Sequence, residues 1–275
     1  MGDFVQVHAN KGKVKVNPLT GERLARWLEA QFANFREDLP LWTGLARTLP
    51  GLILELGCGT GRILLPLAAQ GCQILGVDRE TAMLLRLRTR LADTHPPGQV
   101  FLLQADARAL PLRGRFRLIL APLNVLAHLK DSQLLELFTW ASANLAPDGL
   151  LAAELPAPGH LAEPLEQGEP IDTFLDPQTG NPVQVSARTE LSADGHRLEA
   201  MWFYDELMPD GSANRYLLRH RYWVRTPGQL RRLCRMAGLK AVQIFGSYEL
   251  DPFGPSSPLL LFLAAPQQIS DPSAR

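Results

Sequence analysis

Cysteine is scarce in this sequence, charge of either sign is not in excess, and no long apolar run occurs. The three cysteines, Cys58, Cys72 and Cys234, include no CxxC pair, which argues against a zinc site or a disulfide framework and favours reduced thiols in a cytoplasmic protein. The 28 basic and 28 acidic side chains cancel. We therefore expect no bound metal, and no overall electrostatic attraction to nucleic acid or to an anionic membrane.

Signals for export or membrane insertion are missing as well. The opening segment, MGDFVQVHANKGKVKVN, has no apolar signal-peptide core, and no stretch approaches the roughly 18 apolar residues that cross a bilayer. Hydrophobic residues make up 46% of the 275 positions, which is enough for a sizeable core. These features predict a cytoplasmic globular protein built from one large domain, or from one domain with an insertion.

Short apolar runs alternate with helical stretches from residue 51 to residue 155. The expected strands are residues 52–56, 73–77, 100–104, 116–121 and 150–155, and the expected helices are residues 61–70, 81–92 and 131–145. We expect Asp131 or Ser132 to cap the last helix, and a turn at Pro147, Asp148 and Gly149 to precede the last strand. The alternation predicts an α/β fold with a mostly parallel sheet covered on both faces.

Other segments surround this core. Residues 1–50 are predicted to form an N-terminal helical cap, in which Pro40 and Pro50 interrupt the helical pattern. Residues 156–224 are predicted to form an antiparallel β insertion, because the runs 183–191, 196–207 and 215–224 are separated by turn sequences. A helix over 226–237 and strands over 241–247 and 259–264 return the chain to the core, which comprises residues 51–155 and 225–266. The insertion is interpreted as a lid or as a dimer interface, so the chain is expected to be a monomer or a homodimer.

A glycine-rich turn carries the clearest chemical information. In ILELGCGTGR, residues 53–62, an apolar strand runs into three glycines with the spacing G-x-G-x-G, and a helix follows. Such turns bind dinucleotides or S-adenosylmethionine, because glycine lets a ligand approach the backbone closely. The dinucleotide pattern G-x-G-x-x-G/A is not met, since Arg62 holds its last position. Glu55 would repel a pyrophosphate but suit a cationic amino-acid group, so the pattern favours S-adenosylmethionine.

Two more carboxylates follow expected strands. Asp78 ends the second strand, where it could accept both hydroxyl protons of a ribose, or alternatively cap the next helix. Asp106 follows the third strand, where it could accept from an adenine amine, or alternatively be a solvated turn residue. Because the carboxyl ends of parallel strands meet at one edge of the sheet, these groups and the glycine turn are expected to form one site.

The sequence resembles the class I S-adenosylmethionine-dependent methyltransferases, of the small-molecule N- and O-methyltransferase type. The similarity lies in LELGCGTGR (54–62), GVD (76–78), QADARALPL (104–112), LILAPLNVLAHL (118–129) and LAPDGLLAAEL (145–155). It implies a doubly wound, Rossmann-like sheet that ends in an antiparallel hairpin. It also implies cofactor-binding roles for Glu55, Gly57, Cys58, Gly59, Gly61, Asp78, Arg79, Met83, Asp106, Ala107 and Leu123.

The methyl acceptor is harder to predict. His128 follows the fourth strand and is a candidate general base, or alternatively a histidine that opens a helix. Asn124 is a candidate for orienting the acceptor or for closing a turn, and Tyr204 and Tyr222 for lining its pocket or for packing. The predicted reaction is direct methyl transfer to an oxygen or nitrogen of a small molecule. Alternatives are an NAD(P)-dependent oxidoreductase, which the glycine spacing disfavours, and a non-catalytic cofactor-binding regulator.

Overall fold

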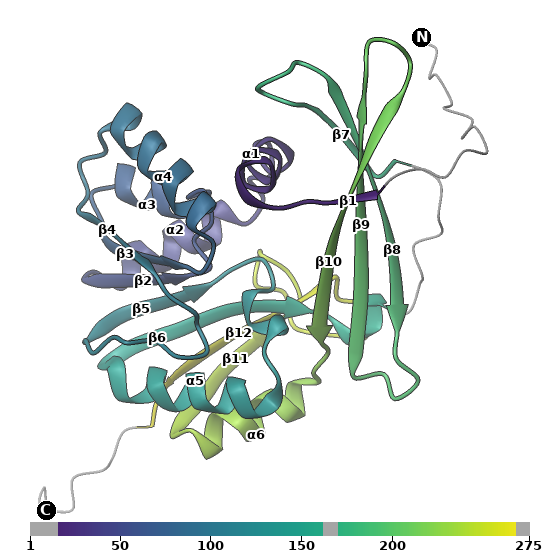
Figure 1. Cartoon of the computed structure of the whole chain (residues 1–275). Coiled ribbons are helices and arrows are strands. Elements are labelled where there is room, and N and C mark those ends of the chain that lie inside the picture. Colours follow the sequence, from purple (N-terminus) through teal and green to yellow (C-terminus); the bar gives the residue numbers. More distant parts are fainter. Residues whose placement is uncertain (1–15, 162–169, 268–275) are drawn as a thin grey trace, which may run out of the picture.

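Two β-sheets organise the chain. The computed structural model describes residues 16–161 and 170–267, and Figure 1 shows the two sheets side by side with helix α1 (Gly21–Gln31) above the space between them. A seven-stranded sheet forms the core, and a five-stranded sheet forms the insertion. Within the described ranges, no helix is long and apolar enough to cross a membrane.

The core sheet has the strand order β11-β12-β6-β5-β2-β3-β4. Its strands are β2 (Leu52–Leu56), β3 (Gln73–Asp78), β4 (Val100–Gln104), β5 (Phe116–Ala121), β6 (Leu145–Pro156), β11 (Leu239–Phe245) and β12 (Leu259–Pro266). Strands β2 to β6 pair in parallel, whereas β12 is antiparallel to both β6 and β11. The predicted α/β fold, with its mostly parallel sheet and terminal antiparallel hairpin, is confirmed.

Helices cover both faces of this sheet, as the alternation predicts. The helices are α2 (Leu39–Thr48), α3 (Leu64–Ala69), α4 (Thr81–Thr94), α5 (Asp131–Asn144) and α6 (Pro227–Met236), with short 3-10 turns η1 (Val125–His128) and η2 (Pro158–Leu161). Successive residues of β2 point to opposite faces: Ile53 packs with Trp42 and Leu64, and Leu54 belongs to the cluster around Phe138. The two clusters hold the carboxyl ends of the core strands in fixed positions.

The insertion sheet combines strands from two distant parts of the chain. Its order is β1-β10-β9-β8-β7, with β1 (Val16–Pro18), β7 (Asp172–Leu175), β8 (Pro182–Leu191), β9 (Arg197–Leu207) and β10 (Ala213–Trp223). The three antiparallel strands expected between residues 156 and 224 are present as β8, β9 and β10. Strand β7 extends this meander, and β1 adds to its other edge in parallel with β10.

Several boundaries differ from the prediction. Residues 1–50 are not purely helical, because their described part begins with β1, and Pro40 lies in the first turn of α2 instead of interrupting a helix. Helix α3 begins at Leu64, later than the expected start at residue 61. The N-cap of α5 is Lys130 and not Asp131 or Ser132, because Gln133 Oε1 accepts from the Lys130 backbone N–H. Strand β6 begins at Leu145, so the expected turn over 147–149 is a bulge within a strand.

Candidate functional site

A cavity of about 1440 Å³ lies at the carboxyl edge of the core sheet, between that sheet, α1 and the insertion sheet. Most of the predicted site residues line it: Glu55, Gly57, Cys58, Gly59, Asp78, Arg79, Met83, Asp106, Ala107, Leu123, His128, Tyr204 and Tyr222. Of the predicted set, Gly61 and Asn124 are not among the described lining residues. Residues that are distant in the sequence thus share one cavity, as the topology of a parallel sheet predicts.

Glu55 is a buried carboxylate without full hydrogen bonding. The side chain is only 2% exposed, and its Oε2 atom has no hydrogen-bond partner in the described part of the chain. Burial raises the pKa of Glu55 to about 8, although the nearby Arg62 guanidinium favours the charged form. A buried acceptor of this kind is costly unless a donor or a cation reaches it.

The glycines of the turn have different surroundings. Gly59 has φ +52°, and a Cβ atom built on it would meet nothing within 4 Å, so its backbone borders open space in the cavity. Gly61 has φ +89°, and a Cβ atom there would overlap the Leu87 side chain of α4. Gly57 and Gly59 therefore border the cavity, whereas Gly61 allows close packing of α4. Cys58 is buried between Gly57 and Gly59, and burial raises the pKa of its thiol.

Asp78 and Asp106 line the cavity, and their carboxylates also accept backbone hydrogen bonds that stabilise nearby turns. Asp78 accepts from the backbone N–H groups of Gly59 (2.8 Å) and Glu80 (2.9 Å), and burial raises the pKa of its carboxyl. It is not the N-cap of α4, which is Glu80. Asp106 accepts from the backbone N–H of Arg108 at 2.8 Å and pairs with the Arg108 guanidinium, which lowers the pKa of the aspartate. Both carboxylates retain further lone pairs that can accept hydroxyl or amine protons.

Sequence analysis missed an ion pair beside the glycine turn. The Arg62 guanidinium donates to both carboxylate oxygens of Asp38, at 2.6 Å each, and stacks over the Phe35 ring. Asp38 is fully buried and also accepts from Trp42 Nε1 at 2.8 Å. Nothing in the spacing of Asp38 and Arg62 indicates this contact, because it forms only when the loop before α2 folds over the core. The two partners act on Glu55 in opposite directions, since Arg62 lowers the pKa of its carboxyl and Asp38 raises it.

Three neighbouring aromatic rings form part of the cavity wall. The His128 ring lies 4.8 Å from the Tyr222 ring and 5.1 Å from the His220 ring, centroid to centroid. His128 Nδ1 is 3.2 Å from the carbonyl oxygen of Arg221. Because a carbonyl can only accept, we assign the proton to Nδ1, which leaves a lone pair on Nε2. Burial lowers the pKa of His128, and that of His220 to about 4. His220 was not predicted, because its role depends on a neighbour far away in sequence.

The other predicted acceptor residues differ in position. Tyr204 is only 1% exposed, packs against Trp27, and donates from its hydroxyl to Gln31 Oε1 at 2.9 Å. Tyr204 thus reaches the cavity wall but also serves as core packing. Asn124 precedes η1 in the left-handed conformation, a position that matches the alternative prediction that it closes a turn.

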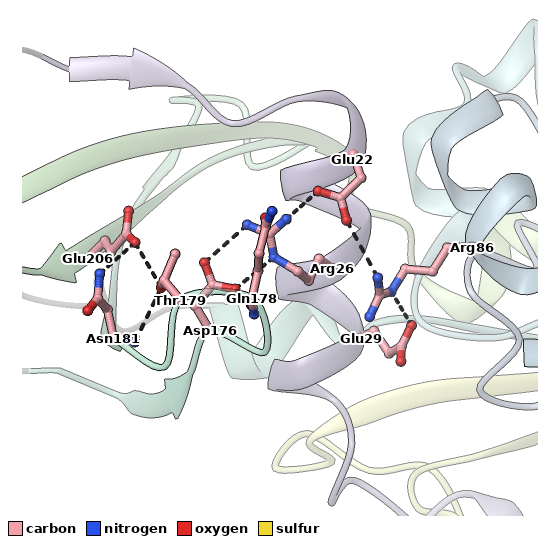
Figure 2. A network of polar contacts seen from close by, with 9 residues as sticks. All are labelled: Glu22, Arg26, Glu29, Arg86, Asp176, Gln178, Thr179, Asn181 and Glu206. Atoms are coloured by element: carbon pink, nitrogen blue, oxygen red, sulfur yellow. Dashed lines mark hydrogen bonds and ion pairs between the residues drawn. The ribbon is translucent and has the colours of Figure 1, made fainter. Parts of the chain in front are cut away.

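Ion pairs join helix α1 to neighbouring elements on two sides, as Figure 2 shows. Towards the insertion sheet, Arg26 donates to Asp176 at 2.7 and 3.1 Å, and both side chains are buried. Towards the core, Glu29 accepts from Arg86 of α4 at 2.5 Å. Burial alone would raise the pKa of Asp176, but hydrogen bonds from Arg26 and from the Gln178 backbone amide hold it at about 2. Helix α1 beside the cavity is therefore held by partners in α4 and in the connection after β7.

Comparison with known proteins supports a methyltransferase core. The family model described as "Methyltransferase domain" matches residues 53–149. A curated relative, the putative methyltransferase YqeM of Bacillus subtilis, is 30% identical over 140 residues, which are 49% of this chain and 54% of that protein. The chain thus spans about half the length of this relative.

Solved structures share the fold over a larger part of the chain. The CcbJ methyltransferase of Streptomyces caelestis has a TM-score of 0.71 at 20% identity, covering 83% of this chain and 95% of that one. The sugar N-methyltransferase KedS8 of a Streptoalloteichus species has a TM-score of 0.70 at 17% identity, covering 95% and 100%. At these identities the likeness concerns the fold alone. The family model matches residues 53–149, so this part of the core resembles a methyltransferase domain in sequence as well as in fold.

Proposed function

We propose that this protein transfers the methyl group of S-adenosylmethionine to a nitrogen or an oxygen of a small-molecule acceptor. The observation that carries this proposal is the buried Glu55 carboxylate, which has an unpartnered oxygen and lies beside the open backbone of Gly59. The ammonium group of an amino-acid ligand would pair with this oxygen and offset the cost of its burial. A pyrophosphate at the same place would be repelled, which disfavours a dinucleotide.

The other cavity residues fit the rest of this cofactor. All of them line the cavity, and we assign the ribose to Asp78 and Arg79 and the adenine to Met83, Asp106 and Ala107. Leu123 also lines the cavity and would contact the methionine part. Gly61 contributes indirectly, by allowing α4 to pack under the turn. S-adenosylmethionine, when bound, supplies an activated methyl group on a sulfonium, so the protein has mainly to align the acceptor and exclude water.

The ring cluster of His128, His220 and Tyr222 supplies the acceptor side. All three side chains line the cavity, and their rings pack against one another. The Nε2 lone pair of His128 can accept the proton that the acceptor releases, since desolvation and the Arg79 charge lower the pKa of this imidazole and favour its neutral form. A small acceptor is also supported by the solved relatives, which include the amino pentose methyltransferase CalS10 and the glycopeptide N-methyltransferase MtfA.

Ligand binding tests the cofactor assignment directly. We expect S-adenosylmethionine and S-adenosylhomocysteine to raise the melting temperature and to bind in calorimetric titrations, whereas NAD⁺ does neither. Asp78→Ala should weaken binding at least tenfold, because a charged acceptor is lost, while Asp210→Ala in an exposed turn should leave it unchanged. Stabilisation by NAD⁺ alone would overturn the assignment.

Turnover then separates an enzyme from a cofactor-binding regulator. Protein incubated with methyl-labelled S-adenosylmethionine is offered a panel of amino sugars, small amines and phenols. We expect label to move to at least one of these classes. Cofactor binding without transfer to any member of the panel would contradict the proposed activity.

A further inference from the structure

Two consecutive residues beside the cavity adopt a conformation that L-amino acids rarely adopt. Leu123 has φ +49° and Asn124 has φ +63°, directly after β5. Asparagine tolerates the left-handed region, but for leucine the conformation is strained. Strain of this kind persists only where the surrounding structure holds it, and it is concentrated at functional sites.

The group that holds Leu123 comes from the neighbouring strand. Glu154 of β6 is 5% exposed, and its Oε2 accepts from the Leu123 backbone N–H at 3.2 Å. The Tyr248 hydroxyl, from the connection between β11 and β12, also hydrogen-bonds this carboxyl. Burial raises the pKa of Glu154 to about 7, and the two hydrogen bonds act against that rise. Glu154 is thus a buried carboxyl whose backbone hydrogen-bond partner is the strained residue Leu123.

The strained segment, Leu123 and Asn124, connects the part of the cavity at the glycine turn with the part at His128. Val125 packs against the glycine turn, since a Cβ atom on Gly57 would stand only 2.6 Å from Val125 Cγ2. Farther along, Ala127 N–H donates to Asn124 O at 2.9 Å within η1, the turn that ends at His128. The backbone angles of Leu123 and Asn124 therefore set where Val125 meets the glycine turn and where His128 begins.

We propose that Glu154 is a positioning residue that keeps Leu123 and Asn124 in the left-handed conformation and thereby aligns the glycine turn with His128. Its hydrogen bond to the Leu123 amide favours this conformation over the extended one that leucine prefers. What the aligned cavity binds rests on the proposed function, but the positioning itself is a property of the protein chain.

A double-mutant cycle tests the coupling. Glu154→Ala removes the acceptor, Glu154→Gln keeps an acceptor oxygen in nearly the same shape, and Leu123→Gly removes the strain because glycine adopts positive φ freely. The cycle is completed by the Leu123→Gly, Glu154→Ala double variant. The first readout is hydrogen exchange at the Val125 and Ala127 amides, whose partners are the carbonyls of Pro122 and Asn124 and not Glu154. The second is the affinity for S-adenosylhomocysteine.

We expect Glu154→Ala to speed exchange at both amides and to weaken S-adenosylhomocysteine about tenfold, and Glu154→Gln to recover most of both losses. In the Leu123→Gly background the same alanine substitution should change each quantity less than threefold. Equal losses in the two backgrounds, or a lower melting temperature with both readouts unchanged, would overturn the proposal. If the unmodified protein binds no S-adenosylhomocysteine, the proposed function fails, and the exchange cycle alone still decides the role of Glu154.

Discussion

Among single residues, Glu55 combines burial, negative charge and an unpartnered oxygen in one place. Its pKa of about 8 lies above the ordinary 4.5, so folding favours the protonated form. The stability that this group contributes is therefore fully present below pH 4.5 and is lost as the pH rises towards 8. At neutral pH Glu55 therefore destabilises the unliganded protein, although its carboxyl suits a cationic ligand.

The Glu55→Gln substitution should stabilise the unliganded protein and weaken ligand binding. We expect the variant, measured without ligand at pH 7.5, to be more stable by roughly 1–3 kcal/mol, because a neutral amide replaces a carboxyl that must take up a proton when it is buried. Its affinity for S-adenosylhomocysteine should fall at least tenfold. Thermal unfolding and calorimetry on the same samples measure both effects. A variant with lower stability and unchanged affinity would show that Glu55 serves the fold only.

Binding should also depend on pH through the same group. If the ligand ammonium pairs with ionised Glu55, binding below pH 8 must release the proton. The affinity of the unmodified protein should therefore rise between pH 6 and pH 7.5, by up to about tenfold per pH unit. Glu55→Gln is the control and should show a much flatter profile. A flat profile for the unmodified protein would contradict the pairing.

Two glycines of one motif should respond differently to the same substitution. Gly59→Ala should fold, because its Cβ enters open space, yet bind S-adenosylhomocysteine at least tenfold more weakly. Gly61→Ala should lose about 2 kcal/mol or more of folding stability, since its Cβ overlaps Leu87 in addition to the backbone strain. Circular dichroism melts and calorimetry distinguish the two outcomes. Global unfolding of Gly59→Ala would make that glycine structural.

At the scale of helices and strands, periodicity predicted the elements that carry their own apolar pattern. Strands β2 to β5 and helices α4 and α6 lie close to the expected ranges because their burial follows from local alternation. Strand β1 could not be predicted, since three residues have no periodicity and its partner β10 begins almost 200 positions later. The glycine turn and its following carboxylates were predictable for the same local reason. Arg62 with Asp38, His220, and Glu154 with Leu123 were not, because only tertiary packing brings them together.

The ion pair between Arg26 of α1 and Asp176 provides a prediction at the scale of helices and strands. Arg26→Ala leaves the buried Asp176 carboxylate without its cation, and we expect a loss of about 3 kcal/mol. The pKa of Asp176 is held at about 2, so the contribution is fully present at neutral pH and is lost only as the pH falls towards 2. Arg47→Ala, on an exposed part of α2, is the matched control. Chemical unfolding gives the energies, and equal stability of the two variants would mean that the pair contributes nothing.

At the scale of the whole molecule, the proposed cofactor side comes from the core, whereas the proposed acceptor side combines His128 of the core with residues of the insertion sheet. The core supplies Glu55, Asp78 and Asp106, whereas β10 of the insertion supplies His220 and Tyr222. Substitutions in the insertion should therefore separate the two activities of the cavity. The same division explains why residues 51–155 carry the sequence motifs while residues 156–224 do not.

Tyr222→Ala tests this division. We expect the rate of methyl transfer to fall at least tenfold on the acceptor identified in the panel, because the wall beside His128 is opened to water, while S-adenosylhomocysteine affinity changes less than threefold. Trp223→Ala, the next residue of the same strand and not among the described lining residues, is the matched control. Equal losses of affinity and rate would show that Tyr222 supports the cofactor or the fold.

The place of β12 in the core sheet has a consequence for synthesis of the chain. This strand, residues 259–266, lies between β6 and β11 in the core sheet. In the insertion sheet, β1 can pair only after its partner β10, residues 213–223, has been synthesised. As the chain leaves the ribosome, neither sheet can therefore close until most of it has been made, and the nascent β6 edge is left without its neighbour. Pairing between such distant segments slows folding and exposes strand edges to other chains. We expect soluble expression to depend on chaperones that shield the unpaired β6 edge during translation.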